Sequence, residues 1–124
     1  MKDLSISELI RMQEQLWEKN KDYWKPISPE YGKNYILWMI EEVGECISII
    51  KKKGDLAIMD NPIVRAAFLE EMGDILMYYV EIMRRYQITS KELTEILLLK
   101  HTKNMSRDFQ KEYEALYKAE EEKA

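Results

Sequence analysis

The sequence predicts an all-α protein whose core resembles a four-helix bundle of about four to five helices. Apolar residues recur at the spacing of a helical face over most of the chain, and no stretch alternates apolar and polar residues over a useful strand length. Only four Gly and three Pro interrupt the 124 residues, of which 46% are hydrophobic and 34% are charged. This composition is typical of a folded helical protein rather than of a disordered chain.

A chain of this length is expected to form one domain, residues 1–124, in which about residues 109–124 make a polar helical tail. Such a domain buries a modest core and exposes much surface for its volume. The third predicted helix also carries apolar residues beside its main apolar arc, namely Met72, Leu76, Tyr79 and Met83. These features favour assembly as a homodimer or as a dimer of dimers.

The charge balance and the single cysteine limit the class of protein. A net charge of −4 without an evident basic face argues against a general nucleic-acid binder. No apolar run resembles a signal peptide or a membrane span, so no membrane partner is expected. Cys46 has no second cysteine to pair with, and its apolar neighbours favour a place in the core. Together these features favour the cytoplasm.

The first helix is predicted to begin after Ser5, which forms a capping box with Glu8, and to run to about residue 23. Gln13 lies among the residues of its apolar face. Pro26 and Pro29 then prevent the helix from continuing. The loop at residues 23–29 is aromatic and carries a Lys, which is unusual for a plain connector.

The second helix is predicted to begin at Ser28 and Pro29, as N-cap and first position, and to end at about Lys53 before Gly54. The three lysines at residues 51–53 fit a solvated helix end, where their charge interacts favourably with the helix dipole, in preference to a phosphate site. Residues 54–60 are expected to form a linker.

Asn61 and Pro62 make another pair of N-cap and first position, so a third helix is expected from Pro62 to about Arg85. A capping box at residues 89–92 predicts a fourth helix that continues past Lys100. A polar helical tail follows at residues 109–123.

The chain is organised around two acidic motifs, which lie at residues 41–45 and 70–74 of the second and third helices. Glu71 falls near the middle of an apolar arc, and Asp74 falls roughly 60° to one side of it. Glu42 falls at the border of the apolar stripe of its helix. Glu70 and Glu81 point further out, so we expect their side chains to be solvated.

A carboxylate on an apolar face needs a basic partner, a proton or a metal ion. Four carboxylates from two facing helices, Glu42, Glu45, Glu71 and Asp74, would suit a hard divalent cation. No His accompanies them, whereas zinc sites and di-iron bundles use His. The pattern therefore favours Mg²⁺, with Mn²⁺ as a substitute, over a salt-bridge network. Glu41 is ambiguous, since it fits a ligand, a base that activates water, or a solvated residue.

Three motifs in this order resemble those of the all-α nucleoside triphosphate pyrophosphohydrolases of the MazG-like superfamily. The first is Glu-Glu-x-x-Glu at residues 41–45, and the second is Glu-x-x-Asp at residues 71–74, followed four residues later by Tyr78. The third is Lys-x-x-x-Asn-x-x-Arg at residues 100–107. The resemblance covers about residues 38–107 and identifies the chain as a single MazG-like domain.

The resemblance implies an enzyme that cleaves an NTP or dNTP between the α and β phosphates and releases the monophosphate and pyrophosphate. It implies metal binding by the four carboxylates and a water oriented or deprotonated by Glu41 or Glu42. It also implies that Lys100 and Arg107 hold the phosphate tail, and that Asn104 binds a phosphate, a sugar hydroxyl or a base edge. A role in clearing unwanted nucleotides from the pool rests on the resemblance alone.

The base would need a flat surface, which Trp24 or Trp38 can offer, and Tyr78 can reach the sugar or the base. Without the resemblance, these aromatic residues fit a core, and the three polar residues of the basic segment fit a solvated surface. Two rival functions stay open. One is a non-catalytic helical interaction module, and the other is a metal-dependent hydrolase of another phosphate compound.

Overall fold

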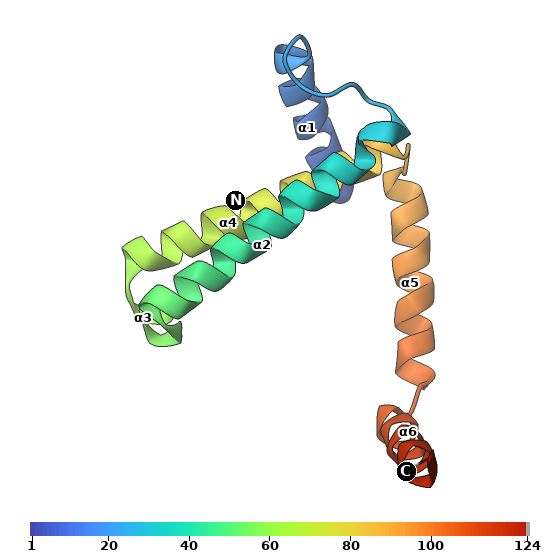
Figure 1. Ribbon diagram of the computed structural model, residues 1–124. Coiled ribbons are helices and arrows are strands. Elements are labelled where there is room, and N and C mark those ends of the chain that lie inside the picture. The colour runs from blue at the N-terminus through green and yellow to red at the C-terminus, as the bar shows by residue number, and fades with distance from the viewer. Residues whose placement is uncertain (124) are drawn as a thin grey trace. The chain divides into compact units, whose positions relative to one another are not determined.

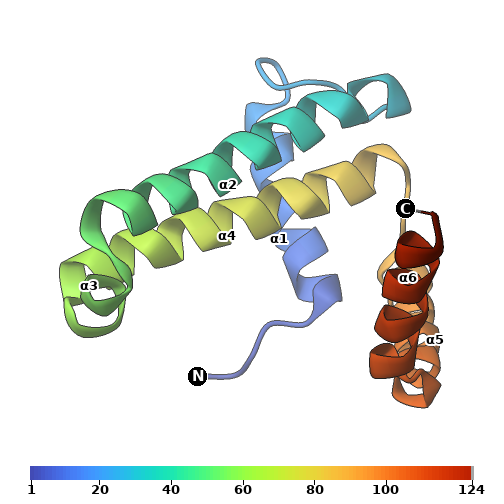
Figure 2. The ribbon, with the colours of Figure 1, turned by 60° about the horizontal axis from the view of Figure 1, so that its bottom comes forward.

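Two long antiparallel helices, α2 (Gly32–Lys53) and α4 (Pro62–Arg85), lie side by side in the first part of the chain (Figure 1). The computed structural model describes residues 1–123. A short helix, α3 (Asp55–Asp60), reverses the chain between the two long helices and contacts both. At the other end of the pair, α1 (Ile6–Asn20) packs across α4 (Figure 2).

The chain divides into two compact units. The first unit is Met1–Ser90 and holds α1 to α4. The second unit begins at Lys91 and holds nearly all of α5 (Ser90–Ser106) and all of α6 (Phe109–Lys123), neither of which has a buried side chain. The described residues contain no strand, so the all-α fold is confirmed. The single domain over residues 1–124 stays a prediction.

Two predicted helix starts are confirmed at the level of hydrogen bonds. The Ser5 hydroxyl accepts from the Glu8 N–H at 3.1 Å, and the Glu8 carboxylate accepts from the Ser5 N–H, which completes the capping box. The Asn61 side chain accepts from the N–H groups of Ile63 and Val64. Side-chain oxygens thus replace the partners that the first turn of a helix lacks.

Several predicted boundaries differ from the structure. α1 ends at Asn20, because the Asn20 carbonyl accepts from the N–H groups of Tyr23 and Trp24 in a turn. The Ser28 side chain caps no helix, and Pro29–Tyr31 form a 3₁₀ turn before α2 begins at Gly32. A Cβ atom on Gly32 would collide with the Tyr86 ring, so glycine permits this close packing.

The linker predicted at residues 54–60 is wrong, because Asp55–Asp60 form α3 and Ile58 of this helix is buried. Gly54 has a φ of 84° and ends α2 as expected. The described residues therefore contain six α-helices rather than four to five.

The buried apolar core of the described residues is small and lies between the helices of the first unit; it comprises Tyr35, Cys46, Ile58, Val80 and Met83. Cys46 is in the core as predicted, and burial raises the pKa of its thiol, which disfavours the reactive thiolate. Met83 was expected on the outer apolar surface and is buried instead, with only 2% of its surface exposed within the first unit. Within residues 1–123, no helix combines the length and the apolar character that crossing a membrane requires.

Candidate functional site

Three of the four predicted carboxylates come together between α2 and α4. Oxygen atoms of Glu42, Glu71 and Asp74 all lie within 4.8 Å of one another, and each side chain is half-buried. Glu71 and Asp74 are one turn apart on α4, and Glu42 faces them from α2. We call this group the acidic triad.

The triad is electrostatically crowded. A hydrogen bond with the Glu71 carboxyl, followed by burial and the charges of Glu71, Asp74 and Glu45, raises the pKa of Glu42 to about 7. The Glu71 Oε2 atom is buried without a hydrogen-bond partner. Closely spaced carboxylates, one oxygen of which lacks a donor, fit a hard divalent cation, which would replace the shared proton and supply the missing partner.

The other acids of the two motifs lie outside the triad. Glu45 is exposed, although its charge contributes to the raised pKa of Glu42, so its role as a ligand stays a prediction. Glu41 is also exposed and lines the cavity beside the triad. Glu70 is exposed as predicted.

A cavity of about 560 Å³ adjoins the triad, and Asp74 belongs to both. The three aromatic residues proposed from the sequence, Trp24, Trp38 and Tyr78, all line it. Burial, together with the nearby charges of Glu42 and Asp74, raises the pKa of the Tyr78 hydroxyl. The cavity therefore places aromatic surface next to carboxylate oxygens.

The aromatic side chains of this cavity contact one another. The rings of Tyr35 and Trp38 meet edge to face with centroids 4.9 Å apart, and the rings of Trp38 and Tyr78 are tilted with centroids 6.4 Å apart. Trp24 lies on the loop after α1 and is exposed. A flat ring entering the cavity would thus find aromatic partners on both α2 and the loop.

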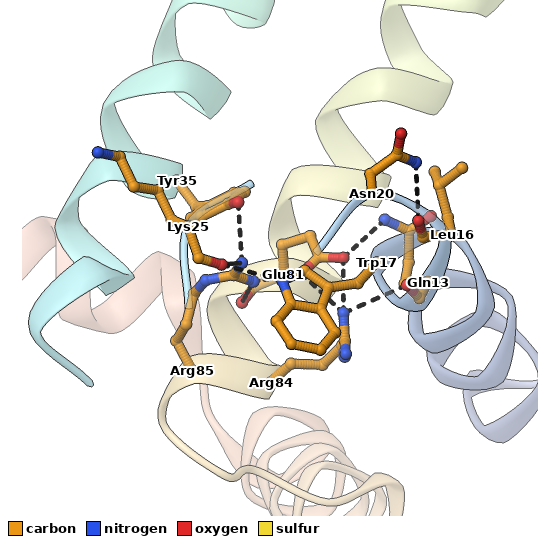
Figure 3. Close-up of polar contacts among 9 residues, drawn as sticks. All are labelled: Gln13, Leu16, Trp17, Asn20, Lys25, Tyr35, Glu81, Arg84 and Arg85. Carbon is orange, nitrogen blue, oxygen red and sulfur yellow. Dashed lines mark hydrogen bonds and ion pairs between the residues drawn. The ribbon is translucent and has the colours of Figure 1, made fainter. Parts of the chain in front are cut away.

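One end of the cavity carries a buried polar network that the sequence analysis missed (Figure 3). Glu81 was expected to be solvated, and this prediction is wrong because α1 covers it; the residue is only 3% exposed. Glu81 accepts from Gln13 Nε2 at 3.0 Å and from Arg84 Nη1 at 2.9 Å, and it pairs with Arg85. Two arginines thus compensate the buried charge.

The same network holds the aromatic loop. The Lys25 carbonyl accepts from Arg85 Nη2 at 3.0 Å and from Trp17 Nε1 at 2.9 Å. Arg85 also donates to the Tyr35 hydroxyl at 2.8 Å (Figure 3). The placement of Gln13 on an apolar helix face was the one sequence signal that pointed here.

The basic segment lies at the end of α5, in the second unit, and all its predicted binding residues are exposed: Lys100, Asn104 and Arg107. Arg107 directly follows Ser106, the last residue of α5. Its guanidinium pairs with Glu112 at 2.7 Å and donates to Asn104 Oδ1 at 3.3 Å. Their role in phosphate binding stays a prediction.

The raised pKa of Glu42 predicts that the metal-free protein loses stability as pH rises from about 5 to 8. In this range the folded protein keeps a proton on Glu42 up to pH about 7, whereas the unfolded chain releases it near 4.5. The unfolded state then binds fewer protons, so the free energy of unfolding falls with pH. A divalent cation should reverse this loss, and should stabilise the protein more at pH 8 than at pH 6.

Thermal unfolding in EDTA and in MgCl₂ at the two pH values measures this effect, with Glu42→Gln as the comparison. The variant should be the more stable protein at pH 8 in EDTA, and it should gain less from the cation. Equal melting temperatures of the two metal-free proteins at pH 8 would contradict the crowding of the triad.

A family model described as the MazG nucleotide pyrophosphohydrolase domain matches residues 31–107. This range contains the acidic triad, two of the aromatic residues of the cavity and the basic segment. It leaves out α1 and the loop that carries Trp24. A comparison with curated proteins and a comparison with solved structures each found no match.

Proposed function

Since the chain belongs to the MazG nucleotide pyrophosphohydrolase family, we propose that it is a Mg²⁺-dependent enzyme that cleaves an NTP or dNTP between the α and β phosphates. The products are the nucleoside monophosphate and pyrophosphate. The observation that supports this most is the acidic triad beside an aromatic cavity, since the pair suits a phosphate–metal complex joined to a flat base. Removal of unwanted nucleotides from the cytoplasmic pool is the role that we propose for it.

Each group of residues has a distinct part in this proposal. The triad, with Glu45 one turn from Glu42, holds the cation, which when bound neutralises phosphate charge and lowers the pKa of water. Glu41 lines the cavity next to the triad and is exposed, so it is our first candidate for orienting or deprotonating the attacking water. Glu42 is the alternative base.

The base of the substrate is proposed to occupy the aromatic cavity, where Trp24 and Trp38 stack on it and Tyr78 contacts the sugar or the base. Lys100, Asn104 and Arg107 are proposed phosphate contacts on the strength of their motif. Because Glu112 already pairs with Arg107, a phosphate would have to displace that carboxylate.

The experiment that tests the function is release of pyrophosphate from a panel of NTPs and dNTPs, with and without Mg²⁺. We expect release that requires Mg²⁺ and differs among the bases. Release of orthophosphate would move the cleavage to another bond. If protein shown to be folded released neither pyrophosphate nor orthophosphate from any nucleotide of the panel, the result would favour a different phosphate substrate or a non-catalytic interaction module.

We also propose that the protein is a homo-oligomer. Apolar side chains spaced three and four residues apart on α2 stay exposed in the single chain: Ile36, Ile40, Val43, Ile47 and Ile50. α4 exposes a second such stripe, which consists of Leu69, Met72, Leu76 and Tyr79. Stripes of this kind are typical of faces that pack against another helix.

Sedimentation velocity should therefore give a mass of two or four times 14.9 kDa. Leu76→Glu, which places a charge in the α4 stripe, should shift the protein toward the monomer. Met59→Glu is the control, because Met59 is also apolar and exposed but lies on α3. A wild-type monomer at micromolar concentration would contradict the proposal.

A further inference from the structure

The side chain of Gln13 is held in one orientation at the wall of the aromatic cavity. Gln13 is only 6% exposed, and it lines the cavity together with Glu81. Its Nε2 atom donates to Glu81 Oε1 at 3.0 Å. Among residues 1–123, the Gln13 Oε1 atom accepts no hydrogen bond, and unlike Glu71 Oε2 it is not sealed from solvent. An accessible acceptor is thus left at a largely buried position.

Glu81 enforces this orientation of the amide. Its Oε1 atom also accepts from Arg84 Nη1 at 2.9 Å, and its Oε2 atom accepts from Arg84 Nη1 at 3.0 Å and from Arg85 Nη1. An ionised carboxylate has no proton to donate. If the Gln13 amide turned over, two acceptor oxygens would face each other in a buried site, which is costly.

The charged residues of the cavity favour the same kind of ligand as the unpaired Gln13 Oε1 atom, namely one that donates hydrogen bonds. Three acids line the cavity, namely Glu41, Asp74 and Glu81, against a single lysine, Lys25. Arg84 and Arg85 are committed to Glu81, so they offer few donors to a ligand. A ligand edge that carries N–H donors fits such a wall better than an edge dominated by carbonyl oxygens.

We infer that Glu81 is a positioning residue which, through Gln13, makes the cavity select nucleobases that bear an exocyclic amino group. Cytosine and adenine present such a group, whereas uracil and thymine present carbonyl oxygens on both sides of their single N–H. This inference rests on the proposed function only in that it places the base in the cavity. Arg85, which pairs with Glu81, also donates to the Lys25 carbonyl and so holds the loop that carries Trp24. The same network therefore supports both the aromatic wall of the cavity and the orientation of Gln13.

The test is binding of nucleoside monophosphates without metal, followed by quenching of tryptophan fluorescence. We expect the deoxycytidine and deoxyadenosine monophosphates to bind the wild-type protein at least tenfold more tightly than the deoxyuridine and thymidine monophosphates. Gln13→Leu should remove this preference and leave Glu81 paired with both arginines. Gln15→Leu, a change of the same residue type at an exposed position of α1, should behave as the wild type.

Glu81→Gln gives a result that a merely structural role cannot. The new amide should place its nitrogen at the former Oε1, because Oε2 receives donors from both arginines, whereas Oε1 receives a donor from Arg84 alone once Gln13 turns over. Gln13 would then turn over and present its NH₂ group to the cavity. The preference should therefore invert toward uracil and thymine. If Glu81→Gln does not fold, the binding preference of Gln13→Leu alone tests the inference.

Equal affinities of the four monophosphates for the wild type, or tighter binding of the keto bases, would overturn the inference. So would the absence of saturable quenching with every monophosphate. A uniform loss of affinity in Glu81→Gln would reduce Glu81 to a structural residue and would also overturn it. Because the assay needs neither metal nor hydrolysis, a protein that cleaves no triphosphate can still show the base preference.

Discussion

Replacement of Glu71 by Gln is expected to reduce pyrophosphate release by at least about 100-fold while leaving the helices intact. Glu71 belongs to the acidic triad, and its Oε2 atom is buried without a donor. Glutamine has nearly the same shape, but it removes one negative charge and one oxygen ligand. The cation should therefore bind weakly, and turnover should fall with it.

Two further measurements separate loss of the cation from loss of the fold. In EDTA, Glu71→Gln should melt at or above the wild-type temperature, because it relieves repulsion between crowded carboxylates. The stabilisation by MgCl₂ that we expect for the wild type should be absent. Glu70→Gln is the matched control, since it makes the same change one residue earlier on an exposed side chain and should keep full activity. Full activity of Glu71→Gln would defeat the assignment of the triad.

The triad could be predicted from the sequence because it depends on local geometry. Residues 71 and 74 must share a helix face, and the apolar pattern around them shows that this face is turned inward. Because α2 packs against α4, Glu42 then lies beside Glu71 and Asp74. The all-α class and the Ser5 and Asn61 caps follow from equally local rules, which the structure confirms.

The polar network could not be predicted in this way. Gln13 and Glu81 are 68 residues apart, and their contact depends on how α1 crosses α4. From the helical period alone, Glu81 is predicted to point away from the face of α4 that packs against α2, and therefore toward solvent. In the structure, α1 covers that side of α4. The helix α3 was missed because six residues carry too little periodicity to distinguish a short helix from a linker.

Glu81→Leu is expected to lower the free energy of unfolding by about 3–5 kcal/mol. The change would leave Arg84 and Arg85 without their counter-ion. Arg85 is 0% exposed and its Nε atom already lacks a partner, so it cannot turn to water. Urea unfolding of wild type and variant at one protein concentration measures the difference.

The matched control is Glu18→Leu, which breaks the exposed pair of Glu18 with Lys21 and should cost less than about 1 kcal/mol. A double variant with Glu81→Leu and Arg85→Met should recover much of the loss, because it removes a buried charge together with its counter-ion. A loss below about 1 kcal/mol in Glu81→Leu would mean that the network is open to water in solution. In that case Gln13 would be free to turn over, and the cavity would have no fixed acceptor with which to select a base.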